Sequence, residues 1–448
     1  MQVREYALLT TRPDAVATID VGVISQATFD WILTFTESWS RDITVLYDRG
    51  HRALKLGSLV GYLRSPEGEE IEILPKTGLG RDNPLEGRLV LRTMLASALS
   101  LKSYESGDAQ LMASELPIHE WIYGQFLNAL QKLLSRGLRF DYLEIKEEVT
   151  YLRGRIDMSA QQRQRPGSAH RFQVQHEIYS PDRLENRLLK SALVSVHRSC
   201  RTSENWRVSN VLMHQLDELP TEPNVHGGMD KWSDARLMQG YGEVKPWCSL
   251  ILRQMNPDFQ KGKHSGIALL FPMERLFEKH VACTLSTQVL PDWRLKQQVK
   301  SKYLIQSHAV ESHTQAQRMF ALSPDLLLEG KNESHVLDTK WKLLDQNNVK
   351  DKYGLLQSDF YQMFAYAHGY QNGSGDMMLI YPRHSSFEKP LPPFEYNAGL
   401  VIWAVPFCLQ SDTLVSGLWE SRFPAFGEAS PVGLNSGRLQ YSVCRGSA

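Results

Sequence analysis

The chain has 448 residues, of which 42% are hydrophobic and 22% are charged. This balance is typical of a folded soluble protein and excludes a disordered or fibrous one, and at about 100–200 residues per domain the length predicts two to four folded units. Fifty basic residues balance fifty acidic ones, so the whole molecule exerts no net attraction on nucleic acid. DNA binding would have to come from local patches or from a partner that delivers the DNA.

The sequence contains no evident targeting or membrane segment. The N-terminus, MQVREYALLT, lacks the apolar stretch of a secretory signal, and no stretch approaches the roughly 18 uninterrupted apolar residues of a membrane helix. The five cysteines are scattered and form no cluster with zinc-ligand spacing. Scattered free thiols indicate a reducing compartment, so we expect a cytoplasmic protein with no membrane partner.

Residues 1–105 are expected to form a β-rich N-terminal domain. The segments 57–64 and 71–75 are apolar and joined by a polar turn, which predicts two paired strands. Apolar residues at helical spacing then predict a helix over 89–99.

Residues 106–265 are expected to form a mainly helical middle domain. Residues 121–134 carry an amphipathic stripe that ends at a basic residue and Gly137, as helix C-termini often do. A second helix is predicted after Pro181, with Asp182 as its N-cap or first-turn acid. Between them, the basic and Gln-rich segment 153–171 is expected to be an exposed loop or hairpin.

From residue 266 to residue 448 helices and strands alternate, which predicts a C-terminal α/β domain and an α+β multidomain protein overall. Residues 271–281 are predicted to be helical, with Pro272 in the first turn. Two short strands should follow, then a helix over about 355–370 and strands at 378–381 and 400–407.

Two short acidic motifs on either side of a polar turn give the clearest chemical signal. The first, Ser-Pro-Asp325, opens an apolar run, and the second, Asp338-Thr-Lys340, closes another. The polar segment 329–334 between them predicts a β-hairpin. Because side chains alternate along a strand, Asp338 and Lys340 should share one face, with Asp325 brought beside Asp338; the other face should carry Leu337, Thr339 and Trp341.

This set of side chains is suited to phosphodiester hydrolysis. Two carboxylates can bind a hard divalent cation, which activates water and neutralises charge on the phosphate, while the lysine stabilises the anion or positions the nucleophile. Taken alone, a D-x-K tripeptide is most often a charge pair on a surface strand. Here both motifs lie beside apolar strand residues, where two acids and a lysine are costly to bury unless they bind something. We therefore expect a Mg²⁺ site, which Mn²⁺ can also fill.

Two helices are expected to complete the site. The upstream helix offers Glu274 and Glu278, four residues apart and therefore on one side, and Glu278 borders the apolar stripe more directly. The downstream helix offers Gln362 and Tyr366, which could reach a phosphate or the attacking water. The alternative for each pair is ordinary: solvated glutamates, and core packing of an aromatic-rich helix.

Taken in order, these segments resemble the McrC family, the nuclease subunit of McrBC-type, modification-dependent type IV restriction systems. Any single motif is unspecific, but the ordered set is fairly specific and spans roughly residues 55–410. Its members are 135–142, 152–157, 184–193, 273–281, 323–325, 338–340 and 361–366.

The resemblance implies a C-terminal PD-(D/E)xK endonuclease domain and a fixed set of roles. Asp325 and Asp338 would bind the metal, Lys340 would be the catalytic lysine, and Glu278 and Gln362 would support them, with Glu278 a third metal ligand. The family's N-terminal part docks into a McrB-like AAA+ GTPase hexamer and stimulates its nucleotide hydrolysis. This chain has no P-loop motif, so we expect it to bind no nucleotide itself, with DNA and the motor as its partners.

The resemblance leaves open where this chain would contact the McrB-like hexamer. Unlike shorter McrC proteins, the chain has about a hundred β-rich residues before its helical part. The segment 153–157 is either a ring-contacting element or an ordinary basic hairpin. The change of pattern near residue 265 predicts that a fragment 1–265 suffices to stimulate the motor.

Two other functions are compatible with the sequence. A PD-(D/E)xK nuclease that works without a motor, in DNA repair or another defence system, would share the active site. A non-catalytic adaptor could keep the fold only to activate a motor, although it would have little reason to retain mutually repelling acids.

Overall fold

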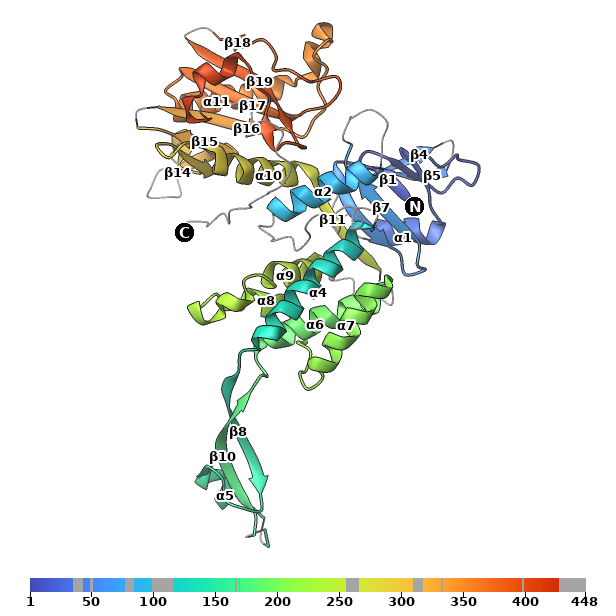
Figure 1. The fold of residues 1–448 in the computed structure, drawn as a ribbon, viewed down its shortest axis with the longest axis vertical. Coiled ribbons are helices and arrows are strands. Elements are labelled where there is room, and N and C mark those ends of the chain that lie inside the picture. The colour runs from blue at the N-terminus through green and yellow to red at the C-terminus, as the bar shows by residue number, and fades with distance from the viewer. Residues whose placement is uncertain are drawn as a thin grey trace. The chain divides into compact units, whose positions relative to one another are not determined.

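The computed structural model describes residues 1–34, 43–48, 51–76, 84–98, 116–165, 167–168, 170–254, 266–308, 317–331, 333–396 and 399–426 (Figure 1). The chain forms two compact units. The first joins Met1–Ile118 to His264–Ala448, and the second is His119–Lys263. The predicted division into three domains at 105 and 265 stays a prediction, and the first unit contains both its first and its third part.

The described residues of the N-terminal part of the first unit form two small sheets and the helices α1 and α2. One sheet has the strand order β1-β7-β6-β11 and the other β3-β2-β5-β4. The antiparallel pair β6 and β7 confirms the two strands predicted around the polar turn, and α2 confirms the predicted helix. The bounds are β1 Gln2–Arg4, β2 Leu8–Thr10, β3 Val21–Val23, α1 Gln26–Leu33, β4 Ile43–Asp48, β5 His51–Leu56, β6 Leu59–Arg64, β7 Glu70–Leu74, α2 Pro84–Ala98 and β11 Ile267–Pro272.

Strand β11 corrects the predicted start of the following helix. Residues 271 and 272 are the end of this strand, which pairs antiparallel with β6, and α10 begins only at Met273. A proline suits a strand end and a helix start alike. The strand β6 was predicted, but its pairing with residues 267–272 was not, because no local pattern links two segments about two hundred residues apart.

The C-terminal part of the first unit is built on a mixed sheet. Among the described residues this sheet has seven strands, in the order β12-β15-β16-β17-β19-β18 with β20 beside β19. Strands β16, β17 and β19 are parallel, whereas β12, β15 and β16 form an antiparallel meander. The bounds are α10 Met273–Gln288, β12 Arg294–Gln297, β13 Lys302–His308, β14 Gln317–Leu322, β15 Leu326–Glu329, β16 Ser334–Thr339, η3 Val349–Gly354, α11 Gln357–Tyr370, β17 Gly375–Pro382, β18 Phe394–Glu395, β19 Leu400–Cys408, β20 Thr413–Leu414, η4 Leu418–Arg422 and η5 Pro424–Phe426.

The helices α10 and α11 bury different faces of this sheet. Met363 and Ala367 of α11 belong to a buried cluster with Val336, Leu379 and other sheet residues. On α10, Phe277 packs against Trp341 and Phe407, with ring centroids 5.4 and 6.2 Å apart. Alternate residues along β16 therefore face different helices.

The second unit combines a helical body with a long two-stranded arm. The arm pairs β8 with β10 over nine residues, and its far end carries β9 and α5 (Figure 1). The exposed hairpin predicted for 153–171 is confirmed, because the described residues of this segment connect the antiparallel strands β8 and β10 and are mostly exposed; β9 and α5 within it were not predicted. The bounds are α4 Ile118–Arg136, β8 Asp141–Val149, β9 Arg155–Ile156, α5 Met158–Gln162, β10 Phe172–Ser180, α6 Leu184–Ser199, α7 Ser203–Gln215, α8 Val225–Asp230, η1 Arg236–Tyr241 and α9 Lys245–Gln254.

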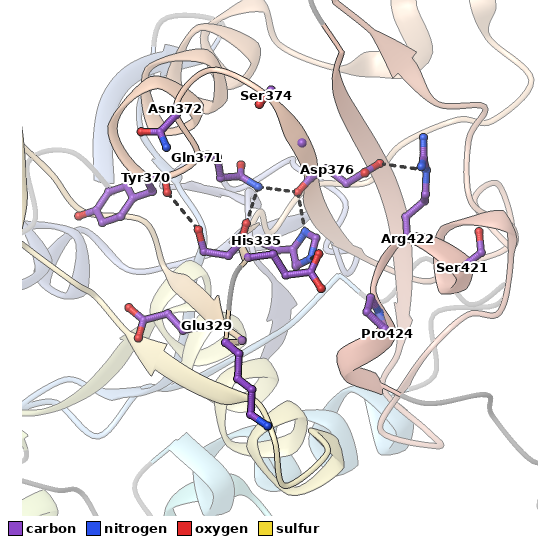
Figure 2. Close-up of a pocket in the computed structure, with 15 residues that line it drawn as sticks. Glu329, His335, Tyr370, Gln371, Asn372, Ser374, Asp376, Ser421, Arg422 and Pro424 are labelled. Carbon is purple, nitrogen blue, oxygen red and sulfur yellow. Dashed lines mark hydrogen bonds and ion pairs between the residues drawn. The ribbon is translucent and has the colours of Figure 1, made fainter.

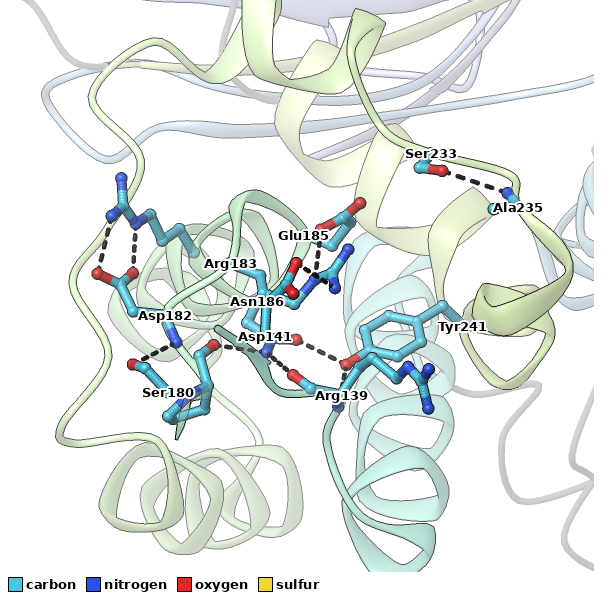
Figure 3. A network of polar contacts seen from close by, with 12 residues as sticks. Arg139, Asp141, Ser180, Asp182, Arg183, Glu185, Asn186, Ser233, Ala235 and Tyr241 are labelled. Atoms are coloured by element: carbon cyan, nitrogen blue, oxygen red, sulfur yellow. Dashed lines mark hydrogen bonds and ion pairs between the residues drawn. The ribbon is translucent and has the colours of Figure 1, made fainter. Parts of the chain in front are cut away.

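A polar network fastens the base of the arm to the helices (Figure 3). The Tyr241 hydroxyl accepts from the Arg139 amide at 2.9 Å and donates to Asn186 Oδ1 at 2.7 Å, while Arg183 pairs with Asp141 at 2.9 Å. Asp182 is not the N-cap that was predicted for α6. Its carboxylate instead pairs with the Arg187 guanidinium, which leaves Arg183 at the N-cap position without a capping bond.

Within the described ranges, no helix has the length and apolar character that crossing a membrane requires.

Candidate functional site

The two acidic motifs lie on the predicted β-hairpin. Strands β15 and β16 pair antiparallel with Leu326 opposite Leu337, and Asp325 immediately precedes β15. The predicted alternation of side chains is confirmed by contacts on both sides. Lys340 reaches Gln362 on α11, whereas Trp341 packs against α10.

Lys340 stands between a carboxylate and an amide. Its Nζ lies 2.5 Å from Asp338 Oδ2 and donates a hydrogen bond to Gln362 Oε1 at 3.0 Å. Burial lowers the pKa of Lys340, but Asp338, Asp325 and Asp359 raise it more, so the net shift is upward. The side chain is therefore a fixed cation at neutral pH.

Asp338 is a buried carboxylate that is poorly satisfied. It is 1% exposed, and its Oδ2 pairs with the Lys340 ammonium, whereas its Oδ1 has no hydrogen-bond partner within the described part of the chain. Burial raises its pKa to about 7, helped by the nearby Asp325 and opposed by Lys340. A buried carboxylate with one oxygen left without a partner is costly unless that oxygen binds a cation or a donor.

Asp325 binds the strand that carries the other two residues. Its Oδ2 accepts two hydrogen bonds from Thr339, from the backbone N and from Oγ1, each at 2.7 Å. Asp325 is thus brought to the residue between Asp338 and Lys340, and it also acts on the pKa of Asp338.

Of the two candidate glutamates on α10, the structure brings Glu278 toward Asp325. Glu278 is partly buried, and its pKa is raised by burial and by Asp325. Glu274 is exposed and bonds to Ser58 in the N-terminal part instead. Gln298, which no sequence motif marks, links the two acidic residues: its Nε2 donates to Glu278 Oε1 at 2.7 Å and its backbone N to Asp325 O at 2.9 Å.

The predicted pair on α11 forms a relay of hydrogen bonds. Gln362 Nε2 donates to the Tyr366 hydroxyl at 2.8 Å, and that hydroxyl donates to the backbone oxygen of Ser323 at 2.9 Å. Gln362 is thereby oriented with its oxygen toward Lys340. Tyr366 is 5% exposed, with its pKa raised to about 12 by burial, so it orients Gln362 and is not directed outward to a phosphate.

Asp359, in the first turn of α11, is a further acid that the sequence analysis did not include in the site. It is 8% exposed and acts on the pKa of both Asp338 and Lys340. Its position three residues before Gln362 places both on one side of the helix, and this spacing could have identified it.

The donor set is compatible with a hard divalent cation. Carboxylate oxygens are the ligands that Mg²⁺ prefers, and Oδ1 of buried Asp338 has no hydrogen-bond partner among the described residues. Among the residues that the structure describes, no group of three or more His, Cys, Asp or Glu side chains is arranged closely enough to hold a metal ion. Asp338 with Asp325 is thus the better supported pair, and Glu278 would have to approach them.

A separate cavity of about 720 Å³ lies where the β15–β16 turn meets the start of β17 (Figure 2). Its lining includes His335, Gln371 and Asp376. Gln371 Nε2 donates to the backbone oxygens of Ser334 and Asp376, and His335 Nδ1 also bonds the latter. These bonds tie strand ends to α11, and the described residues lining the cavity include none of the predicted site residues.

Comparison with known proteins gives consistent matches. A family model described as "McrBC 5-methylcytosine restriction system component" matches residues 54–382. A chain of the refined half-complex from the tetradecameric assembly of Thermococcus gammatolerans McrB AAA+ hexamers with bound McrC is similar with a TM-score of 0.65 and 16% identity, over 94% of this chain and 98% of that chain. A chain of the cryo-EM structure of the Thermococcus gammatolerans McrBC complex is similar with a TM-score of 0.45 and 19% identity, over 62% and 84%. No curated protein sequence gives a significant match.

Proposed function

The chain belongs to the McrBC family of 5-methylcytosine restriction system components, and from this membership we propose that it is the McrC-type endonuclease subunit of a type IV restriction complex. In this role it cleaves DNA by metal-dependent phosphodiester hydrolysis in a PD-(D/E)xK domain formed by the C-terminal sheet. It also stimulates the nucleotide hydrolysis of a McrB-like AAA+ GTPase hexamer.

One observation carries the nuclease proposal: Asp338, Lys340 and Gln362 converge on the hairpin to which Asp325 is bonded. A scaffold would gain nothing from burying Asp338 beside a second acid with one carboxylate oxygen left without a hydrogen bond. A catalytic site needs that arrangement, because an incoming cation then restores the missing interactions.

Each side chain has a defined task in the proposed reaction. Asp338 and Asp325 would hold Mg²⁺, with Glu278 as a third ligand, and the ion would supply an activated water and neutralise charge on the phosphate. Lys340, a fixed cation, donates hydrogen bonds to a phosphate oxygen or to the attacking water. Gln362 holds the lysine in place, and Tyr366 fixes the orientation of Gln362.

The arm of the second unit is the part that we assign to the motor. Exposed aromatic rings line its base, where Tyr142 and Tyr179 lie 5.1 Å apart and are 66% and 63% exposed. Its far end carries exposed arginines at 153, 155, 163 and 165. Exposed aromatic and arginine side chains are typical of protein interfaces. The polar network at the base of the arm couples the position of the arm to the helical body.

The separation of the two tasks can be tested with Asp338→Ala and Lys340→Ala. Each should reduce cleavage of 5-methylcytosine-containing DNA to background, with the motor and Mg²⁺ present, because each removes a group at the reacting centre. Stimulation of the motor's nucleotide hydrolysis should stay at the wild-type level. Lys296→Ala is the matched control, since this lysine lies on the same sheet but pairs with Glu329 at the surface. Cleavage at the wild-type rate by both variants would show that the site is elsewhere.

A further inference from the structure

A buried carboxylate from the N-terminal part of the first unit reaches the residue that follows Lys340. Glu5 is 1% exposed, and the indole Nε1 of Trp341 donates to its two oxygens, 2.9 Å from each. We propose that Glu5 is a positioning residue that fixes, through Trp341, the strand end bearing Asp338 and Lys340. This inference rests on the proposed nuclease function.

Glu5 is itself held firmly by the N-terminal sheet. It lies between β1 and β2, where its backbone N donates to Leu74 O at 2.9 Å and its Oε1 accepts from the Lys76 amide at 2.7 Å. The next residue, Tyr6, has a left-handed φ of 64° and donates its amide to Gly57 O. Such a conformation persists in a non-glycine residue only where the surroundings fix it. The carboxylate is therefore a rigid anchor.

Trp341 connects this anchor to both sides of the site. Its side chain is 8% exposed and its ring packs at 5.4 Å against Phe277, the residue before Glu278. Its backbone directly follows Lys340. A displacement of the indole would thus shift the lysine's strand end and the α10 turn that carries Glu278.

Three neighbouring residues of this strand end are each held by a different element. Asp325 binds Thr339, the β17 oxygen of Ile380 accepts from the Lys340 amide at 2.9 Å, and Glu5 binds Trp341. Without Glu5, the third of these restraints is lost. A displacement of about 1 Å at a reacting group can lower a rate by about a hundredfold.

The choice of a carboxylate at this position also favours a positioning role. Burial raises the pKa of Glu5 to about 7, although the hydrogen bonds from Lys76 and Trp341 oppose the rise. A neutral acceptor would satisfy an indole N–H with less desolvation. A carboxylate binds it more tightly and more directionally, as is needed where geometry matters more than stability.

The test compares four single variants and one double variant in the full chain with the motor, Mg²⁺ and methylated DNA. Glu5→Leu removes the acceptor at similar volume, and Trp341→Phe removes the donor while keeping a ring against Phe277. Both should lower the single-turnover cleavage rate at saturating DNA by at least about tenfold, with the half-saturating DNA concentration unchanged. Glu72→Gln is the matched control: Glu72 is buried in the adjacent strand β7 but bonds to Arg88 and Ile118 of the N-terminal part.

Conservative rescue separates positioning from general loss of structure. Glu5→Gln keeps one oxygen where Oε1 now accepts from both Lys76 N and Trp341 Nε1, so it should retain at least about a third of the rate. In the Trp341→Phe background, Glu5→Leu should cause no further loss, because the same bond is already absent. Glu72→Gln should lower the unfolding temperature without changing the rate.

A readout independent of cleavage tests the bond itself. The indole ¹⁵N–¹H resonance of Trp341, assigned with Trp341→Phe, should shift in Glu5→Leu while the other indole resonances stay. Folded Glu5→Leu and Trp341→Phe proteins that cleave at the wild-type rate would overturn the positioning role while leaving the nuclease proposal intact. A wild-type chain that fails to cleave at all would overturn both, and a shifted indole signal would then report a structural bond only.

Discussion

Asp338 illustrates the conflict between folding and chemistry at the level of a single residue. Its carboxylate is buried, its pKa is raised to about 7, and within the described part of the chain its Oδ1 has no hydrogen bond while its Oδ2 pairs with Lys340. Active sites often contain such groups, because the interactions that chemistry needs are absent until substrate and cofactors arrive. Asp325 on the same hairpin is the opposite case, since its Oδ2 accepts two hydrogen bonds.

The two aspartates should therefore respond in opposite directions to substitution. Without metal at pH 8, Asp338→Asn should raise the free energy of unfolding by about 1–2 kcal/mol. The substitution removes a buried negative charge that the neighbouring acids repel. Asp325→Ala should lower the free energy of unfolding by about 1–3 kcal/mol, because the amide and the hydroxyl of Thr339 both lose the acceptor of their hydrogen bond. Urea unfolding with a chelator present measures both. An Asp338→Asn protein less stable than the wild type would mean that the ion pair with Lys340 outweighs the burial cost.

The effect of Asp338 on stability should also depend on pH. Its pKa in the folded chain, about 7, lies above the roughly 3.9 of an unfolded chain, so the folded state binds the extra proton between these values. Wild-type stability therefore falls as pH rises from about 4 to 7 through this group. The advantage of Asp338→Asn should accordingly be small at pH 5 and full at pH 8.

Among the secondary-structure elements, those defined by local signals were predictable from the sequence. The hairpin β15–β16, the helices α2 and α4 and the strands β17 and β19 follow from apolar periodicity and turn residues within a few positions. Strand β11 was missed, because its place is defined by pairing with β6 and not by its own neighbours. The Asp182 cap was wrong for a similar reason: an arginine one helical turn away competes for the carboxylate.

At the candidate site, too, only residues marked by a local sequence pattern could be predicted. Asp325, Asp338, Lys340, Glu278 and Gln362 could be chosen because their motifs are short and ordered along the chain. Gln298 has a left-handed φ of 45° and lies outside the described helices and strands. No sequence pattern marks it. Glu5 is more than three hundred residues away from Trp341, so only the folded chain reveals their bond.

The pairing of β6 with β11 depends on a close approach that only glycine allows. Gly61 has a φ of +135°, and a Cβ there would lie 1.9 Å from Leu269 O on β11. Gly61→Ala should therefore lower the free energy of unfolding by at least about 2–4 kcal/mol. Gly68→Ala is the matched control, since Gly68 also has a positive φ of +88° but has nothing within 4 Å of the added atom; it should cost only about 1 kcal/mol. Equal losses of unfolding free energy in Gly61→Ala and Gly68→Ala, measured by urea unfolding, would show that β11 can shift to accommodate the added methyl group without cost.

At the scale of the whole molecule, the two ends of the chain contribute to one compact unit. Strand β11, which opens the C-terminal part, completes a sheet whose other members lie before residue 75. His280 on α10 also bonds Ser97 on α2 at 2.6 Å and Asp412 beyond β19 at 3.0 Å. The change of pattern near residue 265 lies close to the end of the second unit at Lys263, but a fragment 1–265 would lack β11, a strand that the N-terminal sheet contains.

The fragment that should retain the motor-directed function is instead the second unit alone. Residues 116–263 include the whole of α4, the arm and the helices that pack on one another, with the Trp121 and Trp247 rings in contact at 5.6 Å. Expressed alone, this fragment should unfold cooperatively and stimulate the motor's nucleotide hydrolysis, whereas fragment 1–265 should self-associate because β6 becomes an exposed edge. Circular dichroism, light scattering and a turnover assay with purified motor measure these outcomes. Removing the arm's far end, residues 150–171, tests the same surface in the full chain: it should abolish stimulation while leaving Mn²⁺ binding at Asp338 unchanged. The opposite result would be a fragment 1–265 that unfolds cooperatively, stays monomeric and stimulates the motor, together with a folded fragment 116–263 that does not stimulate it. That result would assign the motor contact to the N-terminal sheets.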